Sequence, residues 1–561
     1  MKRIISILLV CFMLVALLAG CGKQAATESE TSAPAESETA EAETTDPLLA
    51  ELVDGKFKET KKITVEVYDR GNEGGTPPED NFWTNYIKEG LLRDHNIEVE
   101  FVPVSRWNEV EEINNLLAAG DAPDVCVTYS YPTIQTYANM GGVLDLGPYL
   151  RKYKDLLPNL YSLLGEQNLF FDEDPEAHTV WAIEALLYNN ARINTFVRED
   201  WLKKLNLPEP TTLEEFENML YAFKDNAKLL LGDEANKMIP FSISYDIGWR
   251  ADHLLAAFVP DSLTDEEAYI YGFDDRHILY PNIKEGVRVL NKWYNEGLIW
   301  KDFNLYGAGD TTEDNLMKAG YVGSFIHNWD YPYRNGQDSI QVNLKKMAGE
   351  DAAYIAVNTF KNDAGVYRKF LSAPIDRKVF FPSTNDEPLA SLLYLDWISD
   401  PEHIKFLQVG EEGVHHQVAD DGAIQMLTVT GEKIMNSPNN IDYTITINGL
   451  NLGDKELTEK SLALSYAGIE PRYIEKALEL STKDGRIFAT FNVGEIKAEE
   501  GMGPALSSKR DNFLVQAVCC SPEEFDEVFD AGMQDYLSSG GQAIIDERKE
   551  KLKEIYGYEG D

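Results

Sequence analysis

Aromatic and polar side chains stand together directly after two apolar runs of this sequence. One group follows residues 239–243 and the other follows residues 321–326. Ligands of open α/β folds bind beyond the carboxyl ends of strands, so these positions are candidates for ligand contacts. Ring faces can stack on a ligand, while amide, carboxylate and guanidinium groups can bind its polar atoms. The candidates are Tyr245, Trp249, Arg250, Asn328, Trp329 and Asp330.

The sequence carries no pattern typical of a catalytic or metal centre. It contains no G-x-S-x-G, H-E-x-x-H or G-x-x-x-x-G-K-[ST] motif, and its histidines and cysteines lack metal-ligand spacing. With 95 Asp and Glu residues, close carboxylate pairs arise by chance and cannot indicate a glycosidase. We expect Cys126, Cys519 and Cys520 to be free thiols, with a bridge from Cys126 as the alternative. The sequence therefore predicts neither an enzyme nor a cofactor.

Strand and helix patterns alternate from residue 63 onward. Three segments have the apolar pattern of strands, namely 63–68, 97–104 and 124–129. Two segments between them carry apolar residues at helical spacing, 81–92 and 107–117. Thr212 and Glu215 have the spacing of a capping box at the start of another helix. This order predicts an α/β protein with a parallel sheet covered by helices.

The N-terminus has the pattern of an export signal. Lys2 and Arg3 precede an apolar run over residues 4–18, which is shorter than the ~20 residues of a membrane-spanning helix. The run ends in Leu-Ala-Gly-Cys, which resembles a bacterial lipobox and implies cleavage before Cys21 and lipid, with palmitate, at that cysteine. An ordinary signal peptide is the alternative. We expect a lipoprotein signal peptide over 1–20 and a disordered lipidated tether over 21–60.

Charge and length restrict the partners and the architecture. The 561 residues include 51 Lys and Arg against 95 Asp and Glu, a net charge of −44. Such an acidic surface repels phosphate, so no nucleic acid is expected and the membrane is contacted only through a lipid anchor. The same charge favours a soluble monomer. The length exceeds a single core of ~250–300 residues and indicates at least two lobes.

Several segments resemble extracellular solute-binding proteins of the maltose-binding type. Residues 120–125 are similar to the family's G-D-x-P-D-hydrophobic signature, and residues 320–329 resemble a segment whose Trp faces the sugar. Residues 180–189 and 354–360 resemble the two strands that cross between lobes, and 391–406 the helical region after them. The length of the chain is similar to that of the larger LipO-like branch. Residues 420–510 match no part of the family.

This resemblance implies a two-lobed α/β fold of the type II periplasmic-binding-protein kind, with the ligand cleft between lobes that close as a hinge. The expected first lobe comprises 61–182 plus about 355–410, and the second comprises 183–354 plus about 411–561. A carbohydrate ligand and the permease subunits of an ABC transporter are the implied partners.

The resemblance also implies ligand contacts in the first lobe and on the first crossover. The implied residues are Asp69, Arg70, Tyr129, Tyr131, Trp181 and Glu184, and we place Trp83 at the rim of the cleft. Alternatives remain open: a salt-bridged turn at 69–70, core packing or rim exposure at 129–131, and hinge packing for Trp181.

We therefore expect a substrate-binding protein of an ABC importer, anchored by lipid to the outer face of the bacterial cytoplasmic membrane, that captures an oligosaccharide. The alternatives are a binding protein for a peptide or another polar solute, a surface glycoside hydrolase, and a sensor or adhesin with the same fold.

Overall fold

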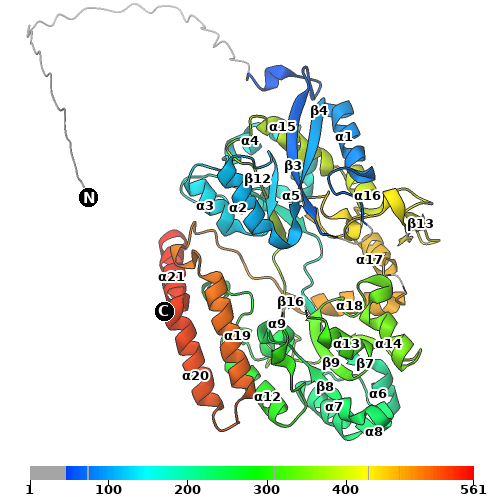
Figure 1. Ribbon diagram of the computed structural model, residues 1–561. Helices are drawn as coiled ribbons and strands as arrows, with labels where there is room; N and C mark the ends of the chain where they lie inside the picture. The colour runs from blue at the N-terminus through cyan, green and yellow to red at the C-terminus, as the bar shows by residue number, and fades with distance from the viewer. Residues whose placement is uncertain (1–45, 72–74, 308–309, 428, 467, 561) are drawn as a thin grey trace, which may run out of the picture. The chain divides into compact units, whose positions relative to one another are not determined.

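The computed structural model describes residues 46–71, 75–307, 310–427, 429–466 and 468–560 (Figure 1). The expected signal peptide, the lipobox with Cys21 and most of the tether lie outside the described residues. Residues 51–561 form one compact unit. Within the described ranges, no helix has both the length and the apolar character needed to cross a membrane.

The first sheet is built around strands from distant parts of the chain. Its strands lie in the order β15 (Ile447–Asn448), β6 (Ile183–Leu187), β12 (Ile375–Phe380), β5 (Cys126–Thr128). The parallel pair β3 (Lys61–Asp69) and β4 (Ile97–Ser105) joins it through a bridge between Val65 and Val125. Three helices pack against β3 or β4: α1 (Phe82–His95), α2 (Glu109–Ala119) and α15 (Pro388–Ile398). The strands and helices predicted near the N-terminus are therefore present.

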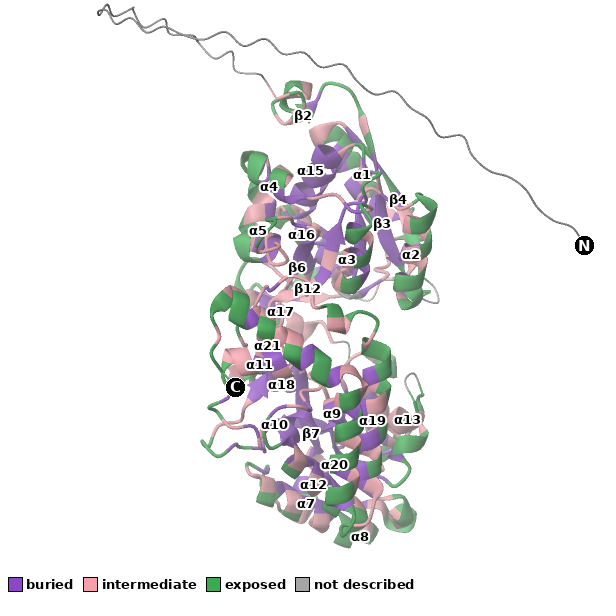
Figure 2. Ribbon diagram, turned by 90° about the vertical axis from the view of Figure 1, so that its left-hand side faces the viewer, coloured by how far each residue is buried: buried purple, intermediate pink, exposed green. Residues whose placement is uncertain are grey.

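The second sheet has β7 (Ile193–Arg198) and β9 (Val322–Asn328) at its centre. The strand β7 is antiparallel to both β9 and β10 (Tyr354–Val357), whereas β8 (Ile239–Ser242) is parallel to β9. The helices α7 (Leu213–Asp225), α12 (Ile283–Asn295), α19 (Gly503–Cys519) and α20 (Phe525–Tyr536) share one apolar core with this sheet. Figure 2 shows β7 as a buried strand among these helices. The parallel pairing places the carboxyl ends of β8 and β9 at the same edge of the sheet.

Strand pairing corrects three of the expected lobe boundaries. Strand β6 pairs with β12 in the first sheet, although residues from 183 onward were assigned to the second lobe. Strand β10 pairs with β7 in the second sheet, although residues from about 355 were assigned to the first. Strand β15 belongs to the first sheet, although 411–561 were assigned to the second lobe. Two-residue strands such as β15 are too short for an apolar pattern, so the sequence carries no sign of this return.

Further helices surround the two sheets. They are α3 (Tyr131–Asn139), α4 (Gly147–Lys152), α5 (Pro158–Leu169), α6 (Glu199–Leu205), α8 (Ala227–Leu231), α9 (Ile247–Arg250), α10 (Asp252–Ala256), α11 (Asp265–Tyr271), α13 (Thr312–Lys318), α14 (Ile340–Ala348), α16 (Pro401–Val409), α17 (Lys455–Leu464), α18 (Pro471–Thr482) and α21 (Gln542–Tyr556). Three short pairs of strands lie outside the two sheets. Two are antiparallel, β1 (Leu52–Val53) with β2 (Lys56–Phe57) and β13 (His416–Val418) with β14 (Ile424–Met426), and one is parallel, β11 (Lys369–Phe370) with β16 (Gly485–Arg486).

Local sequence explains how these elements begin and what they bury. Thr212 caps α7 by accepting a hydrogen bond from the backbone N–H of Glu215. The Glu215 carboxylate also accepts hydrogen bonds from the backbone N–H and the hydroxyl of Thr211, just before the cap. The thiols of Cys126, Cys519 and Cys520 are free, as expected.

Close packing of α1 against α15 depends on a glycine. A Cβ atom added to Gly90 of α1 would lie 2.2 Å from Cζ2 of Trp397, a buried residue of α15. Alanine normally stabilises a helix relative to glycine by up to ~1 kcal/mol, but overpacking a core costs about 1–3 kcal/mol.

We therefore expect Gly90→Ala to lower the free energy of unfolding by about 1–3 kcal/mol, because the indole of Trp397 must move. Urea denaturation measures this change. Glu89→Ala is the matched control, since Glu89 is exposed on the same helix and its replacement should change stability little. A Gly90→Ala protein as stable as the wild type would contradict the packing described here.

Candidate functional site

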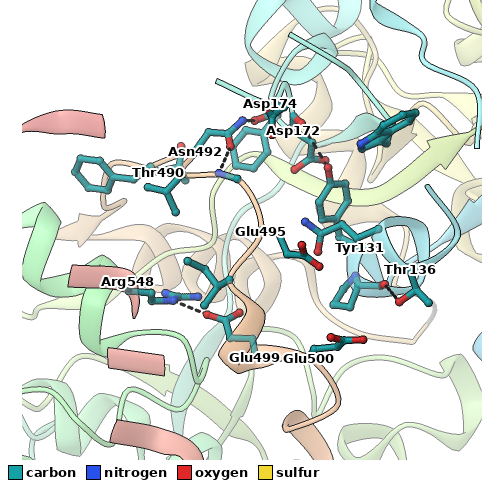
Figure 3. A pocket seen from close by; sticks show the side chains of 18 of the residues that line it. Tyr131, Thr136, Asp172, Asp174, Thr490, Asn492, Glu495, Glu499, Glu500 and Arg548 are labelled. Carbon is teal, nitrogen blue, oxygen red and sulfur yellow. Dashed lines mark hydrogen bonds and ion pairs between the residues drawn. The ribbon is translucent and has the colours of Figure 1, made fainter. Parts of the chain in front are cut away.

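A cavity of about 860 Å³ is the best-defined candidate for a ligand site (Figure 3). One wall comes from α3, the end of α5, the loop after it and Trp181. The other comes from residues 490–501 together with α11 and α21. The aromatic side chains in the lining are Tyr131, Phe171, Trp181, Tyr269, Phe491 and Tyr556. The charged and amide side chains are Asn114, Gln135, Asn139, Gln167, Asp172, Asp174, Asn492, Glu495, Glu499, Glu500 and Arg548.

The segment 490–501 is held in place by α21. Val493 is buried with Ile545 and Leu552 of that helix. The carboxylate of Glu547 accepts hydrogen bonds from the backbone N–H groups of residues 497 and 498, at 2.9 and 2.7 Å. The hydroxyl of Tyr556 donates to the carbonyl of Asn492 at 3.0 Å. This wall is therefore positioned by side chains far along the sequence, not by a strand of either sheet.

Amide side chains connect the two walls of the cavity. The Nδ2 of Asn492 donates to the carbonyl of Phe171 at 3.3 Å and also to the carbonyl of Glu173. The Nδ2 of Asn139 on α3 donates to Oε1 of Glu495 at 3.3 Å. Hydrogen-bonding groups of a kind that can hold hydroxyls thus stand beside the aromatic rings of the lining.

Two of the residues predicted from sequence line this cavity. Tyr131, at the start of α3, donates through its hydroxyl to the carbonyl of Asp172 at 3.4 Å. Trp181 is half-buried just before β6 and packs beside the small apolar cluster that contains Ile134. Their rings belong to the wall formed by the first sheet and its helices, so both remain candidates for stacking on a ligand.

Two neighbouring carboxyl groups are associated with this wall: Asp172 lines the cavity, and Glu184 lies buried behind it. Glu184 of β6 is only 1% exposed and is not part of the lining, whereas Asp172 is. Burial raises the pKa of Glu184 to about 9, and the nearby negative charge of Asp172 adds to this rise. Burial raises the pKa of Asp172 as well, although its hydrogen bond with Glu184 opposes that shift. The Nζ of Lys378 lies 3.3 Å from Oε1 of Glu184 and offsets part of the charge.

The two carboxyl groups hydrogen-bond to each other, which requires a proton on one of them. Glu184 holds this proton, because its pKa is the more strongly raised of the two. At neutral pH the pair therefore carries one proton and one negative charge.

The strand-end residues of the second sheet form a separate cluster. The Nε1 of Trp249 in α9 donates to Oδ1 of Asn328, the last residue of β9, at 3.0 Å. The guanidinium groups of Arg192 and Arg276 each lie 5.0 Å from the Trp249 ring. Sequence reasoning missed both arginines, which lie just before β7 and in the loop after α11.

Trp329 belongs to the same edge of the second sheet. Its ring packs edge-on against Tyr466, with ring centroids 6.2 Å apart, and Tyr466 donates to Asp330 at 2.8 Å. Tyr245 is half-buried in the loop after β8. The cavity described above is lined by none of Tyr245, Trp249, Asn328, Trp329 and Asp330.

Three of the predicted contacts are corrected by burial, and one of them is Glu184, which is 1% exposed and outside the lining. Trp83 is completely buried in α1, where its Nε1 donates to the carbonyl of Ile434 at 2.9 Å, so it is a core residue and not a rim residue. Arg250 is 3% exposed and binds the carboxylate of Glu313 through two nitrogens, at 2.7 and 2.6 Å. Apolar and charged partners from distant segments cover Trp83 and Arg250, which the sequence alone does not reveal.

Asp69 and Arg70 at the end of β3 and Tyr129 after β5 lie outside the cavity lining. Arg70 binds Asp442 through two nitrogens at 2.6 and 2.9 Å, and Asp69 is exposed and accepts from the backbone of Gly71. This geometry matches the alternative of a salt-bridged turn. Tyr129 is half-buried beneath the guanidinium of Arg106, 4.3 Å from its ring. In the part of the chain that the structure describes, no group of three or more potential ligands could hold a metal ion.

Sequence reasoning missed the wall formed by residues 490–501. The only local signal is the adjacency of Phe491 and Asn492, an aromatic and an amide, and no predicted strand precedes them. Their role follows from contacts with residues more than 300 positions away, which no local pattern encodes.

Comparison with known families agrees with this fold. The family model described as bacterial extracellular solute-binding protein matches residues 88–405, more than half of the chain. The chain belongs to this family. The resemblance noted in the sequence is thereby confirmed. Because the family consists of solute-binding proteins, the chain is a binding protein and not an enzyme.

Individual relatives extend the comparison over most of the chain. Polygalacturonan/rhamnogalacturonan-binding protein YtcQ of Bacillus subtilis is 21% identical over 505 residues, 85% of this chain and 89% of that protein. Lipoprotein LipO of the same organism is 28% identical over 236 residues, 40% of this chain and 43% of its own length. The Streptococcus pneumoniae ABC-transporter substrate-binding protein FusA, solved with kestose, has a TM-score of 0.59 at 15% identity, covering 89% of this chain and 100% of that one. This likeness confirms the predicted type II fold.

We expect the proton shared by Glu184 and Asp172 to make stability depend on pH. Folded Glu184 keeps its proton up to about pH 9, whereas an unfolded glutamate releases it near 4.5. The wild type should therefore lose stability relative to Glu184→Gln as the pH rises from 5 to 8, by on the order of 1–3 kcal/mol. Urea denaturation at several pH values measures this difference. Glu214→Gln, at an exposed position of α7, should show no such trend, and a pH-independent difference for Glu184→Gln would exclude the shared proton.

Proposed function

We propose that this chain is the extracellular substrate-binding component of an ABC importer and that it captures an oligosaccharide by hinge closure of two lobes. The observation that carries the proposal is the cavity, in which aromatic rings stand beside amide and carboxylate groups contributed by distant segments. Family membership supports the transport role. The name of the relative YtcQ and the kestose bound to FusA support a saccharide as the ligand.

The chemistry of sugars matches this lining. Pyranose and furanose rings present C–H faces that pack on aromatic rings and hydroxyls that bind amides and carboxylates. Trp181 and Tyr131 are the proposed stacking residues, and Asn139 and Gln167 are proposed to bind hydroxyls. A volume of about 860 Å³ lies in the upper part of the ~300–1,000 Å³ range of small-molecule sites, which favours several sugar units over one.

Closure is proposed to bring the strand-end cluster of the second sheet to the ligand. Trp249 and Asn328 lie at the carboxyl ends of β8 and β9, where ligands of α/β folds bind. The segment 188–192 connects β6 of the first sheet to β7 of the second, and we propose it and residues 358–374 as the hinge. Trp329, on the same sheet edge, would then contact the sugar from the opposite side to Trp181.

A lipid anchor and a monomeric state complete the proposal. The lipobox at residues 18–21 supports lipidation of Cys21 and attachment to the outer face of the cytoplasmic membrane. A relative named as a lipoprotein, LipO, supports the same arrangement. Residues 21–60 would hold the folded part away from the membrane.

The ligand class can be tested by thermal-shift screening of the purified protein against a glycan library beside a pool of peptides. A ligand that binds only the folded state raises the melting temperature. We expect hits among the oligosaccharides, recovered chemically intact after prolonged incubation. Hits confined to the peptides would contradict the proposed cargo.

We expect Trp181→Ala and Trp329→Ala each to weaken binding of a saccharide found in that screen by at least tenfold, which corresponds to about 1.4 kcal/mol. Isothermal titration calorimetry measures the affinities, and the melting temperature without ligand reports whether each variant is folded. Trp107→Ala is the matched control, because Trp107 is 71% exposed and lies outside the lining. An unchanged affinity for Trp181→Ala would show that the cavity does not bind the saccharide. An unchanged affinity for Trp329→Ala would show that the strand-end cluster of the second sheet does not contact it.

Replacing Cys21 tests the anchor. We expect Cys21→Ala to abolish incorporation of labelled palmitate and to move the protein from the membrane fraction of the producing bacterium to the medium. Cys519→Ala is the control, since its thiol belongs to the folded part. Labelled, membrane-bound Cys21→Ala protein would show that the lipid is attached elsewhere.

A further inference from the structure

We propose that the cavity selects uncharged oligosaccharides and rejects those that contain uronate units. This inference rests on the proposed function, because it names the ligand class of the same site. The charges of the lining support it. The ligand proposed here therefore differs from the one in the name of the relative YtcQ. The name of that protein refers to polygalacturonan, a polymer whose units carry carboxylates.

Carboxylates outnumber cations in the lining of the cavity. Five acidic residues contribute to it: Asp172, Asp174, Glu495, Glu499 and Glu500. Arg548 is the only basic residue in the same lining, and Figure 3 shows it beside Glu499. Lys497 lies within the segment that forms one wall but is not part of the lining.

Arg548 is already committed to other groups. Its Nε binds Oε1 of Glu499 at 2.6 Å, and its Nη1 donates to the carbonyl of Tyr269. Its guanidinium also lies 4.5 Å from the Tyr269 ring. A uronate would have to compete with Glu499 for this guanidinium. Arg548 therefore does not offer the bidentate carboxylate site that an unpaired arginine forms.

The remaining carboxylates keep the cavity negative. Within the described ranges, Asp174, Glu495 and Glu500 make no ion pair. Oδ1 of Asp174 accepts backbone hydrogen bonds from residues 176 and 177, at 2.9 and 2.6 Å, and Oε1 of Glu495 accepts from Asn139. The pair of Asp172 and Glu184 adds one further negative charge, which Lys378 offsets.

These charges discriminate between classes of sugar. Hydroxyl groups of a neutral sugar can donate hydrogen bonds to the carboxylates, and such charge-assisted bonds are strong. A uronate brings its own negative charge against them, and like charges across an interface oppose binding and suppress the wrong partner. The net charge of −44 adds a long-range repulsion that slows the approach of anions.

A matched pair of probes isolates charge from sugar identity. Oligogalacturonides of three to six units and the same oligomers fully methyl-esterified share their linkage and length but differ in charge. Calorimetry on the full-length protein at low salt should show the esterified form binding at least tenfold more tightly. In the glycan library of the previous subsection, hits should fall among neutral members and not among uronates.

Removing the charge should relax the selection. We expect the double variant Glu495→Gln, Glu500→Gln to narrow the ratio of the two affinities by at least threefold, because two repulsive charges are lost. Glu214→Gln, an exposed carboxylate of α7, is the matched control and should leave the ratio unchanged. Raising the salt concentration should also narrow the ratio for the wild type, since screening weakens the repulsion.

The outcomes separate this inference from the proposed function. Uronate oligomers that bind as tightly as their esters, or that dominate the library hits, would overturn the charge selection while leaving saccharide binding in place. A ratio unaffected by Glu495→Gln, Glu500→Gln would overturn the assignment to these carboxylates. If no saccharide of either class binds, the proposed function fails and this inference fails with it.

Discussion

The attachment of residues 490–501 to α21 fixes one wall of the cavity. Burial of Val493 among Ile545 and Leu552, together with backbone hydrogen bonds to Glu547, fixes the course of a segment that has little secondary structure of its own. Asn492 then connects that segment to the loop after α5. An irregular segment can form a binding wall only when its backbone groups are satisfied in this way, because a buried polar group without a partner is costly.

The cost of burying charge is a second constraint, and it acts on the carboxyl groups in and behind the cavity wall. Glu184 lies behind the wall and keeps a proton, so the protein avoids two adjacent buried anions beside Lys378. Carboxylates nearer the cavity accept hydrogen bonds from backbone and amide donors. The result is a surface of acceptors beside aromatic rings, which suits a ligand rich in hydroxyl donors. The same surface opposes an anion, so affinity and selection come from one arrangement.

Much of the fold could be predicted from local patterns. The alternation over residues 63–129 indicated β3, β4 and β5 and the helices between them. The rule that ligands bind beyond strand ends selected Trp249 and Asn328, which hydrogen-bond to each other in the structure. The same rule did not identify the cavity, since only Tyr131 and Trp181 of the predicted residues line it. Trp83 and Arg250 were misplaced because a Trp on a helix and an Arg after a strand look alike whether distant residues cover them or not. Burial is a property of the packed chain, not of the neighbouring sequence.

The sequence by itself determined the class of protein: apolar periodicity indicated an α/β fold, the length indicated at least two lobes, and the resemblance of several motifs to solute-binding proteins implied the rest. Only the tertiary structure decided which strands return to which sheet, as β15 does, and which side chains meet across the cavity. Periodicity depends on residues a few positions apart, which the sequence displays directly. The cavity depends on pairs such as Asn492 and Phe171, whose meeting is set by the free energy of packing the whole chain.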